Sequence, residues 1–390
     1  MPIDDARSLF ARANPRASDP QTMQGLFGRS DGLLPLWIAE PYVDLAPSVT
    51  EALTTRARDG WYGYEVRPPD AVRAFWEWAE SRHGWEGSGL QTSVSPSIGT
   101  SIAMLLEELT EPEDGVILQP PVFTDFKPTV VRAGRSVVRN ALLLTDDGYR
   151  MDFDDLEAKA ADPATKVMIL CNPHNPVGRV WSPEELGKIA EICARHGVFV
   201  ISDEIHADLA LPPYKFTPFA GAAENTGVSW AALHGPIKTF GLAGVCDTLL
   251  VTDTKDVTDL FRKRSSQLHV NRNNVFSLAA FEAGYRTGGD WLDGLLELVA
   301  RNVAVLQDGL PDGIELVAPE GTYLAWVDFR GLGMDVPELA RWLSGSARLA
   351  LSPGHWFGRQ GAGFARMTVA APTERIADAT DRLTRAVERA

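Results

Sequence analysis

The stretch from Lys166 to Asp203, KVMILCNPHNPVGRVWSPEELGKIAEICARHGVFVISD, decides the fold. It opens with a continuous apolar run over 166–171, which is typical of a strand covered on both faces. Ser182 then marks the start of a helix, because a proline follows it and a glutamate three residues later completes a capping box. After a His-Gly stop signal, 198–202 is a second apolar strand. This βαβ unit predicts two parallel strands joined by a right-handed crossover.

Helix and strand patterns alternate on both sides of this unit. A turn at 95–100 precedes a predicted helix over 101–109, and 115–118 has the pattern of a strand. Another apolar strand is predicted at 248–252. Such alternation predicts an α/β fold with a mostly parallel, doubly wound sheet.

The C-terminal third has a different pattern. The segments 322–329 and 364–370 alternate as in strands of a half-exposed sheet, and 373–390 has the pattern of an amphipathic helix. These features predict a smaller α+β domain beside the large one.

The length of 390 residues is too great for one ordinary core, so two domains are expected. We predict a large, cofactor-binding domain over 46–285 and a small domain built from 1–45 and 286–390.

The composition excludes several classes of protein. The net charge of −15 argues against nucleic acid or an anionic membrane as the main partner. No apolar run approaches the roughly 20 residues of a membrane span, and Met1 to Phe10 contains no apolar signal region. The three cysteines are scattered and lack metal-ligand spacing. We therefore expect a cytoplasmic protein without a metal site.

One lysine lies in an unusual setting. Lys238 stands in the run HGPIKTFGLAG, over 234–244, among small and apolar residues. This setting suits an amine that is desolvated in a closed pocket and forms an imine with a carbonyl. Asn175 and Asp203 each follow an apolar strand, so both should project from the carboxyl edge of the sheet, where ligands collect. An amine, an amide and a carboxylate are what a pyridine aldehyde cofactor needs, which predicts a pyridoxal 5′-phosphate site.

A phosphate position is also predicted. The turn 97–100 leads into a helix N-terminus, where free N–H groups and the helix dipole favour a phosphate. Each signal has a simpler alternative. The turn could only cap its helix, Asp203 could be a satisfied carboxylate at a strand end, and Asn175 could serve the turn before Pro176.

Several phrases carry a resemblance to a known family. They are LPLWIA (34–39), GY (63–64), CNPHNPVGRVW (171–181), SDEIHADL (202–209), KTFGLAG (238–244) and GTYLAWVDF (321–329). With them the chain resembles the fold-type I pyridoxal-phosphate enzymes, the aspartate aminotransferase superfamily. More narrowly, it is similar to the branch of cystathionine β-lyases and cysteine-S-conjugate β-lyases typified by MalY and PatB. The similarity extends from about residue 34 to about residue 371.

The resemblance implies roles around the cofactor ring. Lys238 would form the imine and then move the Cα proton of the substrate. Asp203 would pair with the pyridine nitrogen and Asn175 with the ring oxygen. His206 would lie near that oxygen or pack beneath the ring. Phe123 would stack on the ring.

The resemblance also implies how phosphate and substrate are held. Ile98 and Gly99 would offer backbone N–H groups to the phosphate. Tyr64 would reach the phosphate and substrate of the neighbouring subunit, which implies a homodimer with shared active sites. Arg366 would clamp the α-carboxylate of an amino-acid substrate, a role that suits a bidentate guanidinium. The alternative interpretation is that Arg366 is a surface arginine at a strand end.

Four departures from the family pattern lie around the predicted cofactor. One is the segment 37–43, which reads Trp-Ile-Ala-Glu-Pro-Tyr-Val where the family normally has Trp-Val-Ala-Asp-Met-Asp-Phe. Phe123 stands where this branch commonly has tyrosine. The phosphate turn reads Pro-Ser-Ile-Gly instead of Pro-Gly-Val-Val, and Gly235 and Ile237 stand where the lysine loop usually carries a nearby serine. A hydroxyl of Ser97 or Thr100 would then compensate at the phosphate.

The resemblance implies a carbon–sulfur β-lyase that acts on a cysteine S-conjugate by α,β-elimination. The departures leave two other outcomes with the same cofactor. One is a decarboxylation-coupled oxidative deamination in natural-product biosynthesis of the lincosamide type, and the other is amino-group transfer. A cofactor-binding regulator is a fourth alternative, although the set of Asn175, Asp203 and Lys238 favours chemistry.

Overall fold

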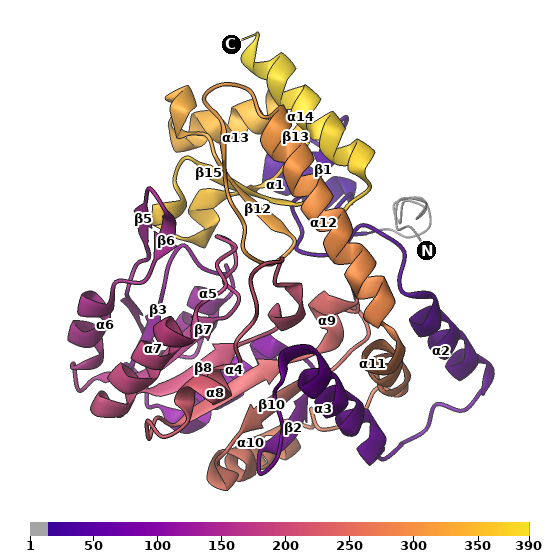
Figure 1. The fold of residues 1–390 in the computed structure, drawn as a ribbon, viewed down its shortest axis with the longest axis vertical. Coiled ribbons are helices and arrows are strands. Elements are labelled where there is room, and N and C mark those ends of the chain that lie inside the picture. The colour runs from indigo at the N-terminus through magenta and orange to yellow at the C-terminus, as the bar shows by residue number, and fades with distance from the viewer. Residues whose placement is uncertain (1–14, 390) are drawn as a thin grey trace.

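A seven-stranded sheet forms the core of the lower part of the molecule in Figure 1, and the computed structural model describes residues 15–389. The prediction made for Met1 to Phe10 lies outside the described residues. The strands are β2 (Gln91–Ser95), β3 (Gly115–Leu118), β4 (Ser136–Arg139), β7 (Thr165–Cys171), β8 (Phe199–Asp203), β9 (Trp230–His234) and β10 (Thr248–Thr252). Their order is β2-β10-β9-β8-β7-β3-β4. β10 runs in the opposite direction to the other six strands, which confirms the mostly parallel α/β sheet.

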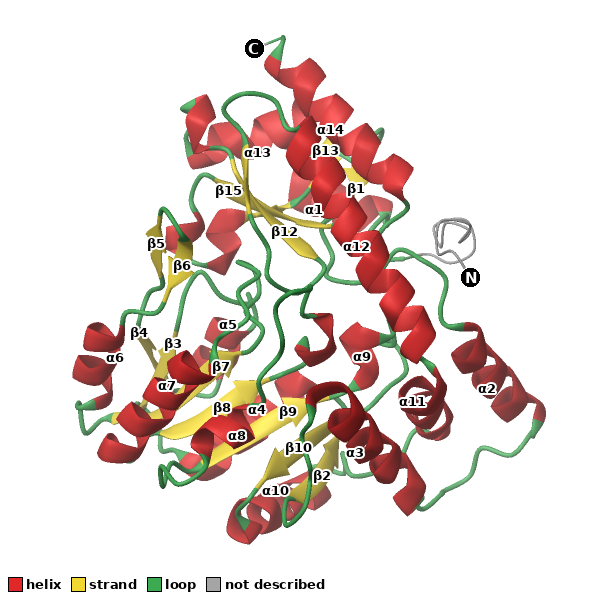
Figure 2. Ribbon diagram, viewed as in Figure 1, coloured by secondary structure: helices red, strands yellow, loops and turns green. Residues whose placement is uncertain are grey.

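Helices cover both faces of this sheet (Figure 2). They are α4 (Ile98–Leu109), α5 (Phe126–Arg132) and α10 (Lys255–Gln267) on one face, with α6 (Phe153–Ala160), α7 (Pro183–His196) and α8 (Phe219–Ala223) on the other. Successive side chains of a strand point to opposite faces. On β7, Val167 and Ile169 therefore join the core under α4, whereas Met168 and Leu170 join the core under α7. Burial on both faces explains why these strands have continuous apolar runs.

The predicted capping of α7 is confirmed. The Ser182 side chain accepts a hydrogen bond from the Glu185 N–H, and the Glu185 carboxylate accepts one from the Ser182 N–H. The helix ends at Gly197, whose φ of 66° a residue with a side chain rarely adopts. This helix carries the chain from the end of β7 to the start of β8, so both strands end at the same edge.

A second sheet forms the upper part of the molecule in Figure 1. Its strands are β11 (Glu315–Val317), β12 (Leu324–Asp328), β14 (Ser352–Pro353) and β15 (Phe364–Thr368), in the antiparallel order β11-β12-β15-β14. The two predicted strands are confirmed, but the half-exposed sheet is wrong. All five residues of β15 and four of the five in β12 are buried.

Both faces of this second sheet are buried, although the alternating sequence pattern predicted one exposed face. Leucines of α12 (Gly289–Gly309) and α14 (Thr373–Val387) share one core with β12 and β15. On the other face, Trp326 packs edge-on against Phe357 at 5.5 Å and donates a hydrogen bond to the Tyr149 hydroxyl at 3.1 Å. That face therefore turns toward the large sheet, and the polar Arg366 opposite Trp326 is buried between the two.

The remaining elements connect the two sheets. They are α1 (Pro20–Phe27), α2 (Pro47–Arg58), α3 (Pro69–His83), the one-turn helix α9 (Pro236–Thr239), α11 (Val275–Thr287), α13 (Val336–Gly345), and the pairs β1 (Leu34–Pro35) with β13 (Leu349–Ala350) and β5 (Leu143–Thr145) with β6 (Gly148–Arg150). The β1–β13 pair ties the N-terminal segment to the C-terminal third. The domain division at 46–285 stays a prediction.

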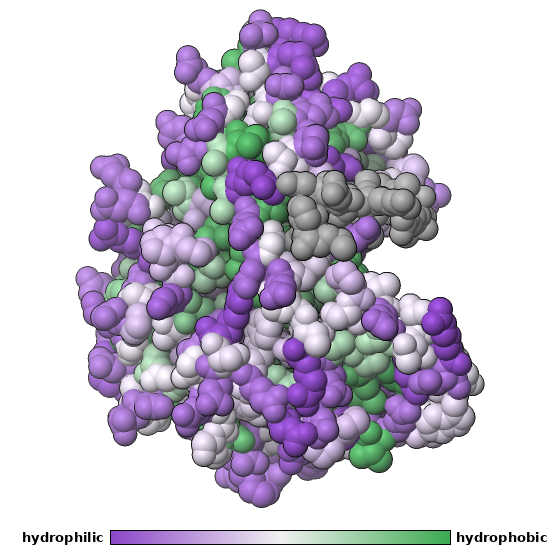
Figure 3. Space-filling view, turned by 45° about the vertical axis from the view of Figure 1, so that its right-hand side comes forward, coloured by the Kyte–Doolittle hydropathy of each residue, from purple (hydrophilic) through white to green (hydrophobic). Residues whose placement is uncertain are grey.

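The surface agrees with the acidic, polar composition. Hydrophilic residues cover most of the face in Figure 3, and hydrophobic residues show there as separate patches. Within residues 15–389, no helix combines the length and apolarity that crossing a membrane requires.

Candidate active site

The ends of three neighbouring strands bring the predicted reactive residues together. β9, β8 and β7 are adjacent and parallel, and Cys171 at the end of β7 lies opposite Asp203 at the end of β8. Asn175 follows β7 by four residues and Lys238 follows β9 by four. The predicted three-point arrangement therefore forms at the carboxyl edge of the sheet, as the topology requires.

These residues line one cavity of about 300 Å³. Seven predicted site residues contribute to its wall: Ile98, Gly99, Phe123, Asn175, Asp203, His206 and Lys238. Others that the sequence did not single out are Ile102, Asp125, Phe126, Thr129, Ile205 and Ala243. The cavity is large enough for a small aromatic cofactor, and its wall combines apolar residues with a few polar groups, as ligand sites do.

The Lys238 amine is partly buried and poised for nucleophilic chemistry. Its Nζ donates a hydrogen bond to the Ala39 carbonyl oxygen at 2.6 Å. Burial, assisted by the positive charge of Arg366, lowers the Lys238 pKa from 10.5 to about 8. About a tenth of the amine is therefore unprotonated at pH 7, far more than for an exposed lysine, and imine formation and proton abstraction require this form.

The Asp203 carboxylate is almost fully buried beside this amine. Its Oδ1 accepts a hydrogen bond from the Ile205 N–H at 3.1 Å. Burial raises its pKa from 3.8 to about 7, although this hydrogen bond and the charge of Lys238 lower it. A cationic ring nitrogen bound opposite the carboxylate would offset the burial and favour the ionised form.

Asp203→Asn should stabilise the cofactor-free protein at neutral and alkaline pH. Because the folded-state pKa lies above the unfolded value, the contribution of Asp203 to stability is fully present below about pH 4 and is lost as the pH rises through about 7. Asparagine does not titrate, so the variant keeps this stability at every pH. Its free energy of unfolding should therefore exceed that of the wild type by an amount that grows from about pH 4 upward, to at most about 4 kcal/mol. Urea denaturation at several pH values measures it. Asp381→Asn, on the exposed surface of α14, is the control. A pH-independent difference for Asp203→Asn would contradict the prediction.

His206 supplies a neutral ring to the same cavity. Burial and the charges of Lys238 and Arg366 hold its pKa well below 6.5. Its Nδ1 is buried without a hydrogen-bond partner among the described residues, and its ring lies edge-on to Tyr323 at 6.1 Å. An unpartnered buried nitrogen at a cavity wall fits a bound group that completes its hydrogen bonding.

The predicted phosphate turn is the first turn of α4. The helix begins at Ile98, one turn earlier than the sequence predicted, and the Ser97 side chain accepts from the Thr100 N–H at 3.1 Å. The N–H groups of Ile98 and Gly99 have no partner within a helix, and both residues line the cavity. This helix end therefore presents free donors and a positive dipole end to an anion.

Arg366 lies buried in the middle of β15, so the surface-arginine alternative is wrong. Its guanidinium donates to Asn175 Oδ1 at 3.0 Å and to the Trp37 carbonyl oxygen at 2.9 Å. It also lies over the Phe357 ring at 4.8 Å. Burial lowers its pKa from 12.5 to about 10, so the group stays charged at neutral pH. Its Nε has no partner within residues 15–389.

Tyr64 lies apart from these residues. Its side chain is 85% exposed and does not line the cavity, whereas the other predicted residues line it or contact it. Its ring lies under the Arg272 guanidinium at 5.4 Å. Within one chain the structure does not bring Tyr64 to the site.

Backbone groups of the N-terminal segment are the main site contribution that the sequence analysis missed. The carbonyls of Trp37 and Ala39 accept from Arg366 and Lys238, and the Tyr323 hydroxyl also donates to the Ala39 carbonyl at 3.1 Å. A carbonyl has no residue-type signature. The only signal was that 34–39 formed part of the family resemblance.

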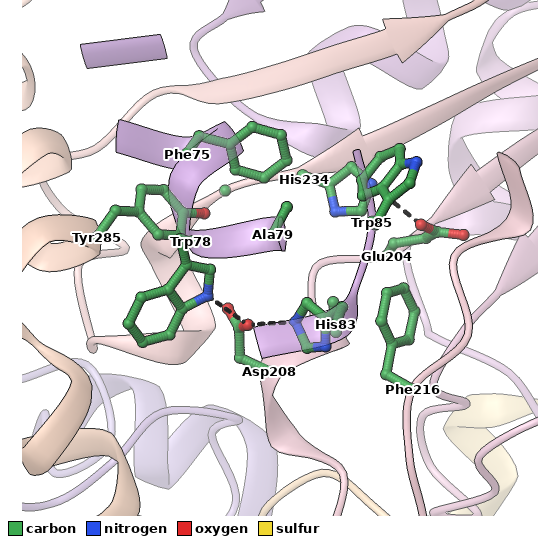
Figure 4. A pocket seen from close by; sticks show the side chains of 12 residues that line it. Phe75, Trp78, Ala79, His83, Trp85, Glu204, Asp208, Phe216, His234 and Tyr285 are labelled. Atoms are coloured by element: carbon green, nitrogen blue, oxygen red, sulfur yellow. Dashed lines mark hydrogen bonds and ion pairs between the residues drawn. The ribbon is translucent and has the colours of Figure 1, made fainter. Parts of the chain in front are cut away.

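A buried polar cluster around Asp208 lies next to the turn that carries the lysine, and Figure 4 shows Asp208 with its partners Trp78 and His83. Asp208 accepts from Trp78 Nε1 at 2.7 Å, lies 2.8 Å from His83 Nε2 and accepts from the Thr239 hydroxyl at 2.7 Å. Burial would raise the Asp208 pKa, but these partners hold it below its usual value. The cavity beside the cluster has a volume of only about 10 Å³, too small for a substrate. Because Thr239 follows Lys238, the cluster fixes the turn that carries the amine.

Asp208→Ala should lower the free energy of unfolding by about 3 kcal/mol. The substitution leaves three buried donors without their acceptor, and breaking such a network costs about 3–5 kcal/mol. Chemical denaturation of the cofactor-loaded protein measures the change, with Asp312→Ala on an exposed turn as the control. Equal stability of the two variants would show that Asp208 does not hold the turn.

The comparisons with known proteins agree with this geometry. A mostly parallel seven-stranded sheet with a lysine, a carboxylate and an amide at its carboxyl edge is the aminotransferase type I fold. A family model described as aminotransferase class I and II matches residues 64–383. The chain belongs to the class I and II aminotransferase family.

Individual relatives cover nearly the whole chain. Cystathionine beta-lyase PatB of Bacillus subtilis is 36% identical over 367 residues, 92% of this chain and 93% of PatB. The crystal structure of cystalysin from Treponema denticola, which contains pyridoxal 5′-phosphate, covers 100% of both chains with a TM-score of 0.93 and 28% identity. The pyridoxal-phosphate-bound C-S lyase from Staphylococcus hominis covers 99% of this chain and 98% of its own, with a TM-score of 0.88 and 26% identity.

Proposed function

We propose that this protein is a pyridoxal-phosphate-dependent carbon–sulfur β-lyase that acts on a cysteine S-conjugate by α,β-elimination. The observation that carries the proposal is a single cavity with Lys238, Asp203 and Asn175 in its wall and Arg366 bonded to Asn175. PatB, named a cystathionine β-lyase, and the C-S lyase from Staphylococcus hominis support elimination over amino-group transfer and oxidative deamination.

The cavity residues fit the cofactor. Asp203 would pair with the ring nitrogen, and Asn175 with the ring oxygen. His206, with its unpartnered Nδ1, would complete the polar contacts of the ring. Ile98 and Gly99 would hold the phosphate through their N–H groups.

Two further residues complete this fit. Phe123 lines the cavity and would stack on the ring, so stacking survives without the phenol that tyrosine would supply. Lys238 would hold the cofactor covalently through its ε-amine. When bound, pyridoxal phosphate supplies an electron-accepting ring that acidifies the Cα–H bond of an amino acid.

The protein's own residues then provide binding and proton transfer. Arg366 holds the α-carboxylate and orients the amino acid, because its guanidinium is fixed by Asn175 and the Trp37 carbonyl. The Lys238 amine, when it is not bonded to the cofactor, would accept the Cα proton. The thiolate departs from Cβ, and the aminoacrylate that is released hydrolyses to pyruvate and ammonia. The apolar wall keeps water away until that hydrolysis.

Product analysis tests this function. The loaded protein should convert S-alkyl cysteines into pyruvate, ammonia and thiol in equal amounts, without oxygen uptake. Carbon dioxide release with oxygen consumption would instead indicate oxidative deamination, and amino-group transfer to a keto acid would indicate an aminotransferase. Absence of both pyruvate and thiol over a panel of conjugates would refute the lyase.

We also propose a homodimer in which Tyr64 completes the partner's site. Tyr64 lies in an exposed segment with Trp61, Tyr62 and Val66, which are 56%, 52% and 90% exposed. Exposed aromatic residues in one segment are characteristic of a protein interface. A monomer in light scattering would contradict this assembly.

The proposed compartment is the cytoplasm. Cys171, Cys193 and Cys246 are free and buried, which fits a reducing environment. Cell fractionation would decide this.

A further inference from the structure

The segment 234–239 carries Lys238, and we call it the lysine turn. It begins at the last residue of β9 and ends with α9. Its far end is fixed by the hydrogen bond from the Thr239 hydroxyl to Asp208 at 2.7 Å. Its near end begins with His234, a buried imidazole that the proposed chemistry does not use. Such a side chain must find its polar partners inside the protein.

Glu204 is the polar neighbour of His234 (Figure 4). His234 Nε2 lies 3.0 Å from Glu204 Oε2, and the two side chains are 4% and 0% exposed. The atoms form a close polar contact without hydrogen-bond alignment, and neither has a hydrogen-bond partner within residues 15–389. In a buried site the low dielectric constant strengthens such a contact and makes an unpartnered polar group costly. Each side chain therefore depends on the other.

The Glu204 carboxylate is held in place by other groups. Its Oε1 accepts hydrogen bonds from the Ser202 hydroxyl and from the Phe219 N–H, both at 2.8 Å. The Glu204 N–H donates to the Leu233 carbonyl oxygen at 2.9 Å, beside His234. Oε1 is thus occupied, and Oε2 is the oxygen that faces the imidazole.

Packing fixes the near end of the lysine turn as well. The His234 ring lies 5.4 Å from the Phe75 ring and 5.1 Å from the Trp85 ring. At Gly235, an added Cβ would lie 3.2 Å from Thr248 Cγ2, so the backbone there is pressed against β10. The imidazole therefore has little freedom to turn away from its acidic neighbour.

Both carboxylates that hold the lysine turn come from one short segment. Glu204 follows Asp203 directly, and Asp208 is four residues further along. Successive side chains at the end of a strand point to opposite sides. Asp203 accordingly lines the cofactor cavity, whereas Glu204 lines the cavity of about 10 Å³ in Figure 4. The segment that carries Asp203 therefore contacts the lysine turn at both ends, and Lys238 lies between the two contacts.

We propose that Glu204 and His234 are positioning residues that fix the distance between the Lys238 amine and the Asp203 carboxylate. The inference rests on the proposed roles of these two groups, which would hold the cofactor covalently and at its ring nitrogen. A cofactor held at two points keeps one orientation only while the distance between those points stays constant. Displacement of a reacting group by about 1 Å can cost about 100-fold in rate.

His234→Phe tests the proposal, because a phenyl ring keeps the packing against Phe75 and Trp85 but offers no polar atom to Glu204. We expect kcat to fall by about 10- to 100-fold. KM should change little, because Arg366 still binds the α-carboxylate. Circular dichroism in the absorption band of the bound cofactor should weaken, since that signal requires a fixed asymmetric setting. This second readout does not depend on turnover.

Glu204→Gln is nearly isosteric and decides the question even if the phenyl ring is not tolerated in the fold. The amide keeps a polar contact to His234 but loses the charge, which makes such contacts roughly twice as strong. We expect a smaller loss of kcat, about two- to tenfold. The double variant Glu204→Gln/His234→Phe should lose no more than His234→Phe alone, because the two residues act through one contact. Losses that multiply, or wild-type kcat and dichroism in both single variants, would overturn the proposal.

Arg135→Ala separates positioning from stability. Arg135 is buried directly before β4, at the opposite edge of the parallel strands, and its Nε donates to the Thr110 hydroxyl at 2.8 Å. This variant should melt at a lower temperature but keep wild-type kcat and cofactor dichroism. If it lost both as His234→Phe does, the contact between Glu204 and His234 would only stabilise the fold.

The two readouts also distinguish this inference from the proposed function. A wild type that releases no pyruvate, while His234→Phe weakens its cofactor dichroism, would refute the lyase and support the positioning role. A wild type that releases pyruvate, with unchanged kcat and dichroism in the His234 and Glu204 variants, would refute the positioning role and retain the lyase.

Discussion

Replacing Lys238 with alanine should reduce the release of pyruvate and thiol by at least about 10²–10⁴-fold, the usual contribution of a positioned acid–base group. The side chain is the amine in the cavity wall whose pKa burial lowers to about 8, so about a tenth of it is unprotonated at pH 7 and can act as a base. Water cannot replace it well, because the amine is held by the Ala39 carbonyl at a fixed place beside the cavity.

Two controls make this result specific. Lys263→Ala removes an exposed lysine of α10 and should retain full activity. Borohydride treatment followed by peptide mass spectrometry should find the cofactor on the peptide that contains Lys238 in the wild type, and on no peptide in Lys238→Ala. An alanine variant with wild-type turnover, or a label on another lysine, would show that a different amine does the chemistry.

Replacing Arg366 with alanine should mainly weaken substrate binding. Loss of one partner from a buried, charged hydrogen-bonded pair costs about 2–5 kcal/mol, which corresponds to about a 30- to 5,000-fold lower kcat/KM. We expect KM to carry most of the change, because the carboxylate contact exists before and during the reaction. Arg366→Lys should retain part of the affinity, since it keeps the charge but loses the bidentate geometry.

A substrate without the α-carboxylate separates this role from a structural one. Wild type and Arg366→Ala should bind an S-alkyl cysteamine equally weakly, since the contact is then missing in both. The substitution also leaves Asn175 Oδ1 without its donor, so a loss of about 1–3 kcal/mol in stability is expected. Arg341→Ala on the surface of α13 should change neither property. A weaker cysteamine complex only in the variant would mean that Arg366 shapes the cavity rather than binding the carboxylate.

The core of the site could be predicted because it follows from local patterns and one topological rule. The apolar runs that end at Cys171 and Asp203 and the capping at Ser182 specify two parallel strands and their crossover. Parallel strands joined in this way end at the same edge. Asn175 and Asp203 therefore had to converge, whereas Lys238 follows β9, a strand that the sequence analysis did not predict.

Other features could not be predicted, because they depend on segments far apart in the chain. Arg366 and Asn175 are 191 residues apart and meet only when the two sheets face each other. The same approach buries β15, whose alternating pattern indicated a half-exposed strand.

By itself, the sequence determined the α/β fold, because periodicity and capping are properties of neighbouring residues, and its motifs carried the resemblance to the family. Only the tertiary structure decided that the carbonyls of Trp37 and Ala39 accept hydrogen bonds from Arg366 and Lys238, and that Tyr64 lies away from the cavity of its own chain. The physical reason is that desolvation, hydrogen bonding and charge depend on which surfaces approach each other in space.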